Sequence, residues 1–237
     1  MSASSTAKEQ NIIDNFGKKL DLDGLELPRF IAIEGPIGVG KTTLAKHLAK
    51  SLNYDLLLEN AQDNPFLERF YNDPASAALP TQLYFLFERT KQIESLRQGD
   101  MFQPVRVADF LIDKDPLFAS VTLDSDELRL YQQVYNQLTI DAPTPDLVIY
   151  LQAPNEVLQG RINTRGVAAE RSISTDYLHR LNDAYMNFFH YYDRAPLLIV
   201  NAAELDLANN PDHYAQLVDY MLRIKSGRHY YNPTPTF

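Results

Sequence analysis

A glycine-rich segment near residue 40 has the residue types that bind phosphate. Residues 35–42 fit the pattern G-x-x-x-x-G-K-[ST] and directly follow an apolar run. The glycines let successive backbone N–H groups point at phosphate oxygens, Lys41 reaches the β- and γ-phosphates, and the Thr42 hydroxyl is a ligand for Mg²⁺. We therefore predict an ATP-binding segment made of Gly35, Pro36, Ile37, Gly38, Val39, Gly40, Lys41, Thr42 and Thr43.

An arginine-rich stretch at residues 161–171 carries Arg161, Arg165 and Arg171. Transfer of a γ-phosphoryl group needs cations over its developing charge, and a lid can supply them while it excludes water. The alternative is an ordinary charged surface. Because GTPases, ATPases and kinases all use the phosphate-binding loop, this stretch is what favours a kinase, with Arg161 and Arg165 predicted to be catalytic and to contact ATP.

A single carboxylate, Glu59, ends the second expected strand. Ligands of open α/β sheets bind at the carboxyl ends of strands, and a carboxylate there can accept the proton of an attacking hydroxyl. A capping or surface acid is the alternative. Glu59 and Lys41 are therefore the predicted catalytic pair.

From Phe30 to about Leu222 the chain resembles the deoxynucleoside kinases, in their bacterial deoxyadenosine/deoxyguanosine form. The resemblance is carried by the phosphate loop with the residues that flank it, and by four short motifs in the same order. These motifs are Leu58-Glu59-Asn60, Tyr71-Asn72-Asp73-Pro74, Thr81-Gln82-Leu83-Tyr84 and Leu117-Phe118-Ala119.

The resemblance implies ATP-dependent phosphorylation of the 5′-hydroxyl of a deoxynucleoside in nucleotide salvage, with magnesium-ATP as donor. It also implies a P-loop kinase fold with a five-stranded parallel sheet, and a homodimer. Gln82 would read the base beside Arg89, and their seven-residue spacing puts both on one helix face, about 10.5 Å apart. By the same resemblance Glu59 is the base, Phe118 stacks on the nucleobase, Tyr71 and Glu170 share the sugar 3′-hydroxyl, and Arg161 and Arg165 contact phosphate.

One motif of the family is missing. Where Glu-Arg-Ser normally follows the third strand, this chain has Asp109-Phe110-Leu111. Asp109 is predicted to replace the magnesium carboxylate beside the substrate, and Lys114 to restore a positive charge, while Asp113 or Asp115 takes the acidic base-reading role. Val167 replaces a lid arginine.

Two other functions stay open because of this departure. The first is a nucleotide-binding protein with weak or no catalysis and a structural or regulatory role. The second is a nucleoside monophosphate kinase, which needs an additional positive pocket for the acceptor phosphate. Gln82 and Tyr71 fit a neutral nucleoside better.

The elements that must position these residues alternate between short apolar runs and helical periods, which predicts an α/β fold. Helices are expected over residues 43–52, 79–96 and 126–138, after the N-capping Ser174, and from Pro211. We divide the chain into an N-terminal tail (1–28), one kinase-like domain (29–227) and a C-terminal tail (228–237). The expected strands are Phe30 to Glu34, Asp55 to Glu59, Pro104 to Asp109, Asp146 to Gln152 and Leu197 to Asn201.

Composition limits the partners. The formal charge is −9 with a pI of about 5.0, which argues against a nucleic-acid surface. The chain has no cysteine, so disulfides and thiolate metal sites are excluded, and no apolar run approaches the roughly 20 residues of a membrane span. We expect a cytoplasmic protein whose partners are ATP and a deoxynucleoside, with no membrane partner.

Overall fold

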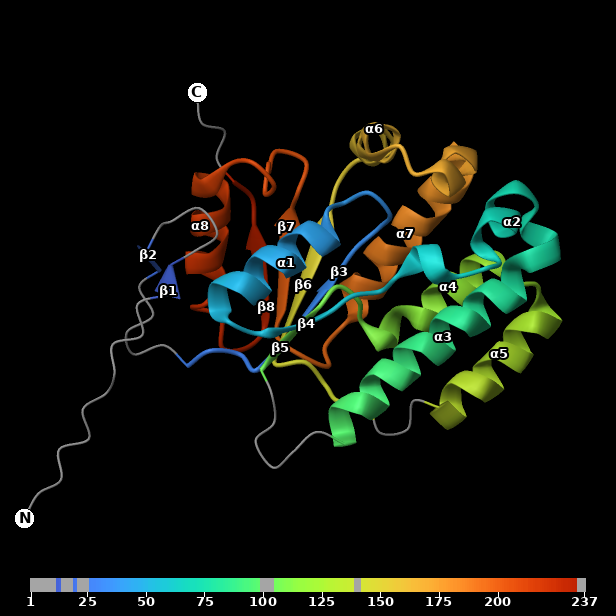
Figure 1. The fold of residues 1–237 in the computed structure, drawn as a ribbon, viewed down its shortest axis with the longest axis horizontal. Coiled ribbons are helices and arrows are strands. Elements are labelled where there is room, and N and C mark those ends of the chain that lie inside the picture. Colours follow the sequence, from blue (N-terminus) through green and yellow to red (C-terminus); the bar gives the residue numbers. More distant parts are fainter. Residues whose placement is uncertain (1–11, 14–18, 21–25, 99–104, 139–141, 234–237) are drawn as a thin grey trace, which may run out of the picture.

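The protein folds around a six-stranded parallel sheet flanked by helices (Figure 1). The computed structural model describes residues 12–13, 19–20, 26–98, 105–138 and 142–233. The strand order is β4-β5-β3-β6-β7-β8, so the predicted α/β class is confirmed. The strands are β3 (Phe30–Glu34), β4 (Asp55–Leu57), β5 (Arg106–Ala108), β6 (Leu147–Gln152), β7 (Leu197–Asn201) and β8 (Arg228–Tyr231).

The prediction of five strands is wrong by one. Strand β8 pairs in parallel with β7, with Arg228 opposite Leu197 and Tyr231 opposite Val200. Residues 228–231 therefore belong to the domain and not to the predicted C-terminal tail. An edge strand of this kind is half-exposed, and its sequence Arg-His-Tyr-Tyr lacks the apolar run that marks the inner strands.

The core lies on both faces of the inner strands. All but one residue of each of β3, β6 and β7 are buried, which is the property of a parallel sheet covered on both sides. The helices of the described chain are α1 (Lys41–Leu52), α2 (Leu67–Asn72), α3 (Pro74–Gln98), α4 (Asp115–Thr122), α5 (Ser125–Leu138), α6 (Asn155–Arg165), α7 (Thr175–Tyr191) and α8 (Pro211–Met221). Helix α5 packs on α3 and α4 on the side away from the sheet (Figure 1).

Helix ends follow local chemistry. Ser174 Oγ accepts a hydrogen bond of 3.1 Å from the Tyr177 N–H, so the predicted start of α7 is confirmed. Helix α3 begins five residues before its predicted start at Leu79, and Pro80 lies inside it without ending it. The described helices include none that is long and apolar enough to cross a membrane.

Short elements complete the described chain. They are three 3-10 helices, η1 (Ala61–Asp63), η2 (Ile112–Lys114) and η3 (Ala168–Ser172), and the two-residue strands β1 (Ile12–Ile13) and β2 (Lys19–Leu20). Strands β1 and β2 pair antiparallel within the predicted N-terminal tail.

The parallel direction of the strands brings the site together. Gly35 follows β3, Asp109 follows β5, and Glu59 lies two residues beyond β4. Because these three strands are neighbours, their carboxyl ends place the phosphate loop and both acids at one edge of the sheet.

Candidate active site

The phosphate loop needs glycine at fixed positions. Gly35 has φ 151°, and a Cβ there would lie 2.3 Å from the Leu151 carbonyl oxygen of β6. Gly38 has φ 83°, and its Cβ would lie 2.8 Å from Ile162 Cγ1 of α6. Both backbone conformation and close packing therefore exclude larger residues, and the loop is held against β6 and α6.

Lys41 begins α1 and turns back over the loop. Its Nζ donates hydrogen bonds to the carbonyl oxygens of Gly35 (2.7 Å) and Pro36 (3.3 Å). Burial lowers the pKa of Lys41, while the neighbouring carboxylates, Glu34 first, oppose that shift. The ammonium thus lies inside the loop, at the positive end of the α1 dipole.

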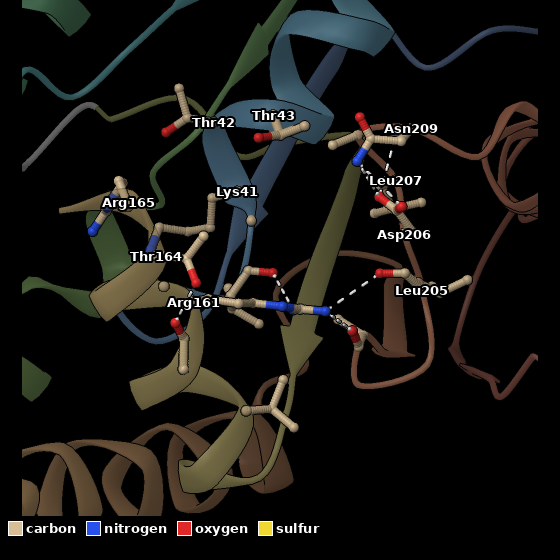
Figure 2. A pocket seen from close by; sticks show the side chains of 17 residues that line it. Lys41, Thr42, Thr43, Arg161, Thr164, Arg165, Leu205, Asp206, Leu207 and Asn209 are labelled. Carbon is tan, nitrogen blue, oxygen red and sulfur yellow. Dashed lines mark hydrogen bonds between the residues drawn. The ribbon is translucent and has the colours of Figure 1, made fainter.

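A cavity of about 660 Å³ opens beside the loop (Figure 2). One wall is the phosphate loop with Lys41, Thr42 and Thr43. The second comes from α6, and the third from the segment after β7, at Ala202 and residues 205–209. This volume suits a nucleotide, and the loop at its base suits the phosphates.

Arg161 lines this cavity but is held by backbone carbonyls. Its guanidinium donates to Val39 O at 3.2 Å, Ala202 O at 2.8 Å and Leu205 O at 3.3 Å (Figure 2). Arg161 therefore joins the phosphate loop to the segment after β7. Arg165, one turn further along α6, lines the cavity and forms an ion pair with Glu170.

A second, smaller cavity of about 150 Å³ contains every predicted substrate-binding residue. It shares Gly38, Lys41, Thr42 and Arg165 with the larger cavity, so the two meet at the phosphate loop. The predicted residues in its wall are Glu59, Tyr71, Gln82, Arg89, Asp109, Phe118 and Glu170.

Glu59 is held between cations. Arg89 binds its Oε1, and Lys114 Nζ lies 4.0 Å from its Oε2. Burial opposes the charged form, but Arg89, Lys114 and Lys41 together outweigh it and lower the pKa of Glu59. The group is therefore a carboxylate at neutral pH, as a proton acceptor must be.

Of the two acids predicted as alternatives, Asp113 and Asp115, only Asp115 contacts Arg89. Asp113 pairs with Arg194 away from the cavity, whereas Asp115 is 1% exposed and its Oδ1 lies 2.7 Å from Arg89 Nη1. Burial raises the pKa of Asp115 to about 6, although Arg89 and Lys114 favour its charged form. Asp115 is thus the acid that adjoins the predicted base-reading pair.

Thr42 and Asp109 form the predicted oxygen pair for magnesium. Thr42 Oγ1 donates to Asp109 Oδ2 at 2.6 Å, while Asp109 Oδ1 accepts from the Glu59 N–H at 2.7 Å. Burial raises the pKa of Asp109, while its hydrogen bonds from Thr42 and the Glu59 N–H, and the charge of Lys41, oppose that shift. Mg²⁺ prefers oxygen ligands and usually binds through one or two protein groups with phosphate and water, so this pair fits it.

Residues 31–224 match the model of the deoxynucleoside kinase family. The chain belongs to the deoxynucleoside kinase family. It is therefore a kinase, and its relatives are kinases of deoxynucleosides.

Relatives of this deoxynucleoside kinase are similar over most of their length. The deoxyguanosine kinase of Bacillus subtilis (strain 168) is 40% identical over 161 residues, 66% of this chain and 76% of that protein. The deoxyadenosine/deoxycytidine kinase of the same organism is 30% identical over 203 residues, 82% of this chain and 92% of the relative. The solved deoxyadenosine kinase of M. mycoides with bound dCTP has a TM-score of 0.70 and 28% identity, over 81% of this chain and 98% of that one.

Some of the kinase site was not predicted. The segment 205–209 forms a wall of the large cavity, and the rule that ligands bind beyond the carboxyl ends of strands, applied to β7, would have found it. Arg171, a predicted lid cation, is exposed and lines neither of the two cavities described here.

Proposed function

We propose that this kinase transfers the γ-phosphoryl group of ATP to the 5′-hydroxyl of a deoxynucleoside. The observation that carries the proposal is the meeting of two cavities at the phosphate loop, one large enough for a nucleotide and one lined by Glu59. With ATP in the larger cavity and the nucleoside in the smaller, the two reacting groups meet beside Lys41.

The reaction requires one proton to move. Glu59 accepts the proton of the 5′-hydroxyl at a carboxylate oxygen as the hydroxyl oxygen attacks the γ-phosphorus and the bond to the leaving ADP breaks. Lys41 and Arg165 line both cavities, so their charges lie where negative charge spreads over the transferred group. Positioning and electrostatics supply most of the catalysis, since the protein forms no covalent bond.

Thr42 and Asp109 are the residues that would hold Mg²⁺. When bound, the ion would neutralise charge on the β- and γ-phosphates of ATP. This assignment rests on the 2.6 Å approach of their oxygens beside the phosphate loop.

The smaller cavity, which we call the acceptor cavity, suits a neutral nucleoside better than a nucleoside monophosphate. Its two arginines already have carboxylate partners: Arg89 pairs with Glu59 and Asp115, and Arg165 pairs with Glu170. Gln82 and Phe118 would hold the base, and Tyr71 with Glu170 the sugar. Adenine, cytosine or, after the amide is flipped, guanine can bind to Gln82, because its amide has both a donor and an acceptor.

The direct test incubates purified protein with labelled ATP and each of the four deoxynucleosides. We expect a 5′-monophosphate, and deoxyguanosine is the first acceptor to try because the 40% identical relative is a deoxyguanosine kinase. Binding of ATP, seen as thermal stabilisation, with no product from any acceptor would instead favour the nucleotide-binding protein without catalysis.

We further propose that the enzyme recycles deoxynucleosides as a homodimer. Helices α3 and α5 lie side by side (Figure 1). The dimer is supported by an exposed apolar side chain on each of them, Phe87 of α3 and Leu130 of α5. Analytical ultracentrifugation tests it, since a Phe87→Glu variant should sediment as a monomer. A wild-type protein that sediments as a monomer would contradict it.

A further inference from the structure

Lys114 is a buried cation in the wall of the acceptor cavity. It ends η2, and its side chain is 1% exposed. An ammonium out of water is costly unless charges or hydrogen bonds compensate it, so its neighbours indicate why it is there.

Lys114 lies between two carboxylates. Its Nζ is 3.4 Å from Glu34 Oε2, 3.5 Å from Glu34 Oε1 and 4.0 Å from Glu59 Oε2. The Phe118 ring covers it, with the ring centroid 4.6 Å from Nζ. The ammonium therefore joins the acid at the end of β3 to the predicted base after β4.

Neutralising Glu34 does not explain this placement by itself. Glu34 already accepts three shorter hydrogen bonds, from the Gly35 N–H (2.9 Å), the Leu111 N–H (2.9 Å) and the Tyr185 hydroxyl (2.8 Å). The contact with Lys114 is the longest of the four. The ammonium is thus at the long end of hydrogen-bond distance from Glu34 and also lies within 4.0 Å of Glu59 Oε2.

The two oxygens of Glu59 differ in their partners. Arg89 of α3 binds Oε1, whereas Oε2 has Lys114 at 4.0 Å, which is too far for a hydrogen bond and close enough for charge attraction. Oε2 is therefore the oxygen with acceptor capacity left for a substrate hydroxyl.

We propose that Lys114 is a positioning residue for Glu59: it holds the carboxylate by charge with Oε2 available to the acceptor hydroxyl. Glu34 holds Lys114 in place through their ion pair. Glu34 also accepts a hydrogen bond from the first N–H of the phosphate loop, so the position of the Glu59 carboxylate is linked to that of the phosphates. The inference deepens the proposed function and rests on it, since Glu59 must be the base.

The test is a double-mutant cycle that measures kcat and the acceptor KM for Glu59→Gln, Lys114→Met and the double variant. We expect Lys114→Met to lower kcat by up to about 10²-fold, as misplacing a reacting group does, with the acceptor KM changed less than about twofold. The double variant should be no slower than Glu59→Gln, because Lys114 acts through that carboxylate. Lys114→Arg should recover part of kcat, and Lys91→Met, which alters an exposed lysine of α3, is the control.

Lys114→Met could fail to fold because it leaves the buried Glu34 carboxylate without its ion-pair partner. A second variant, in which Glu34 is also neutralised, covers that case. In Glu34→Gln/Lys114→Met both buried charges are removed, and ATP-induced thermal stabilisation checks that the phosphate loop is intact. A low kcat in this folded variant supports the inference. Recovery of wild-type kcat in this variant would show that Lys114 only neutralises Glu34. If the fold losses of kcat in Glu59→Gln and Lys114→Met multiply in the double variant, Lys114 does not act through Glu59. Absence of any product from wild-type protein would instead remove the proposed function itself.

Discussion

Charges of opposite sign alternate through the acceptor side of the site. Asp115 pairs with Arg89, Arg89 with Glu59, and Lys114 lies between Glu59 and Glu34. Arg89, Glu59 and Lys114 each have charged partners on two sides, so removing one of them leaves a buried neighbour uncompensated, which costs more than an exposed ion pair contributes. Substitutions that keep shape and remove charge are therefore the informative ones here.

Glu59→Gln keeps the size of the side chain and removes the proton acceptor. We expect kcat to fall by about 10²- to 10⁴-fold, the usual contribution of a general base, while ATP still stabilises the protein. Steady-state kinetics and thermal unfolding with ATP measure the two effects. Glu68→Gln, an exposed acid on α2, is the matched control. Unchanged turnover would remove Glu59 from the mechanism.

Asp115 gives a pH prediction for stability. Its pKa is about 6 in the folded protein and lies near 3.8 without the fold, because burial disfavours the carboxylate. Below both pKa values Asp115 is protonated in the folded and the unfolded protein, so it does not affect stability. Above both values it is charged in both states, and the folded state bears the full cost of burying the charge. Wild-type stability should therefore fall relative to Asp115→Asn as pH rises from about 4 to 7, by on the order of 2 to 3 kcal/mol. Urea unfolding of both proteins at several pH values measures this, and a difference that does not vary with pH would contradict it.

At the scale of elements, the sequence predicts what local pattern determines. The strand Phe30–Glu34 is marked by its apolar run. The start of the helix that follows the phosphate loop is marked by glycines with a positive φ. Helix α7 is marked by Ser174, whose hydroxyl caps it. Strand β8 could not be found in this way, because its four residues gain their structure from pairing with β7 and not from a buried face.

The sequence predicts a site residue well where that residue stands in a short, recognisable motif. Glu59, Gln82 and Arg89 all line the acceptor cavity as expected. The partners of these residues could not be predicted from the sequence. Only the folded chain shows that Asp115 pairs with Arg89 while Asp113 pairs with Arg194. Arg161 shows the same limit: it was expected in a lid stretch but lies within α6, and its three carbonyl partners come from two distant segments.

Those partners give a prediction for α6. Arg161→Lys keeps the charge but loses the planar set of donors that joins the phosphate loop to the segment after β7. We expect the KM for ATP to rise by roughly tenfold or more, as for loss of a charged hydrogen bond of about 1.5–3 kcal/mol, with a smaller change in kcat. Arg171→Lys, on the exposed side of the lid, is the control. A fall in kcat without a change in the KM for ATP would place Arg161 on the transferred phosphoryl group instead.

At the scale of the whole molecule, the sheet has two edges with different roles. Glu59 follows the edge strand β4 and lines the smaller cavity, while β7, which lies next to the other edge strand β8, leads into the wall of the larger cavity at residues 205–209. Strand β8 covers the outer edge of β7, and none of its residues 228–231 lines the larger cavity.

Truncation after Gly227 tests whether β8 supports the sheet. The shortened chain loses the β7–β8 ladder, the 3.0 Å hydrogen bond from Arg228 to the Tyr192 carbonyl, and the packing of Tyr231 on Tyr220. An exposed β7 edge also invites pairing with other chains. We expect lower thermal stability, increased aggregation and a higher KM for ATP, with a smaller change in the KM for the nucleoside. Truncation after Pro233 retains all of β8 and is the comparison. Equal stability of the two truncated proteins would mean that β8 does not support the sheet, and a selective rise in the nucleoside KM would mean that its influence reaches the opposite edge.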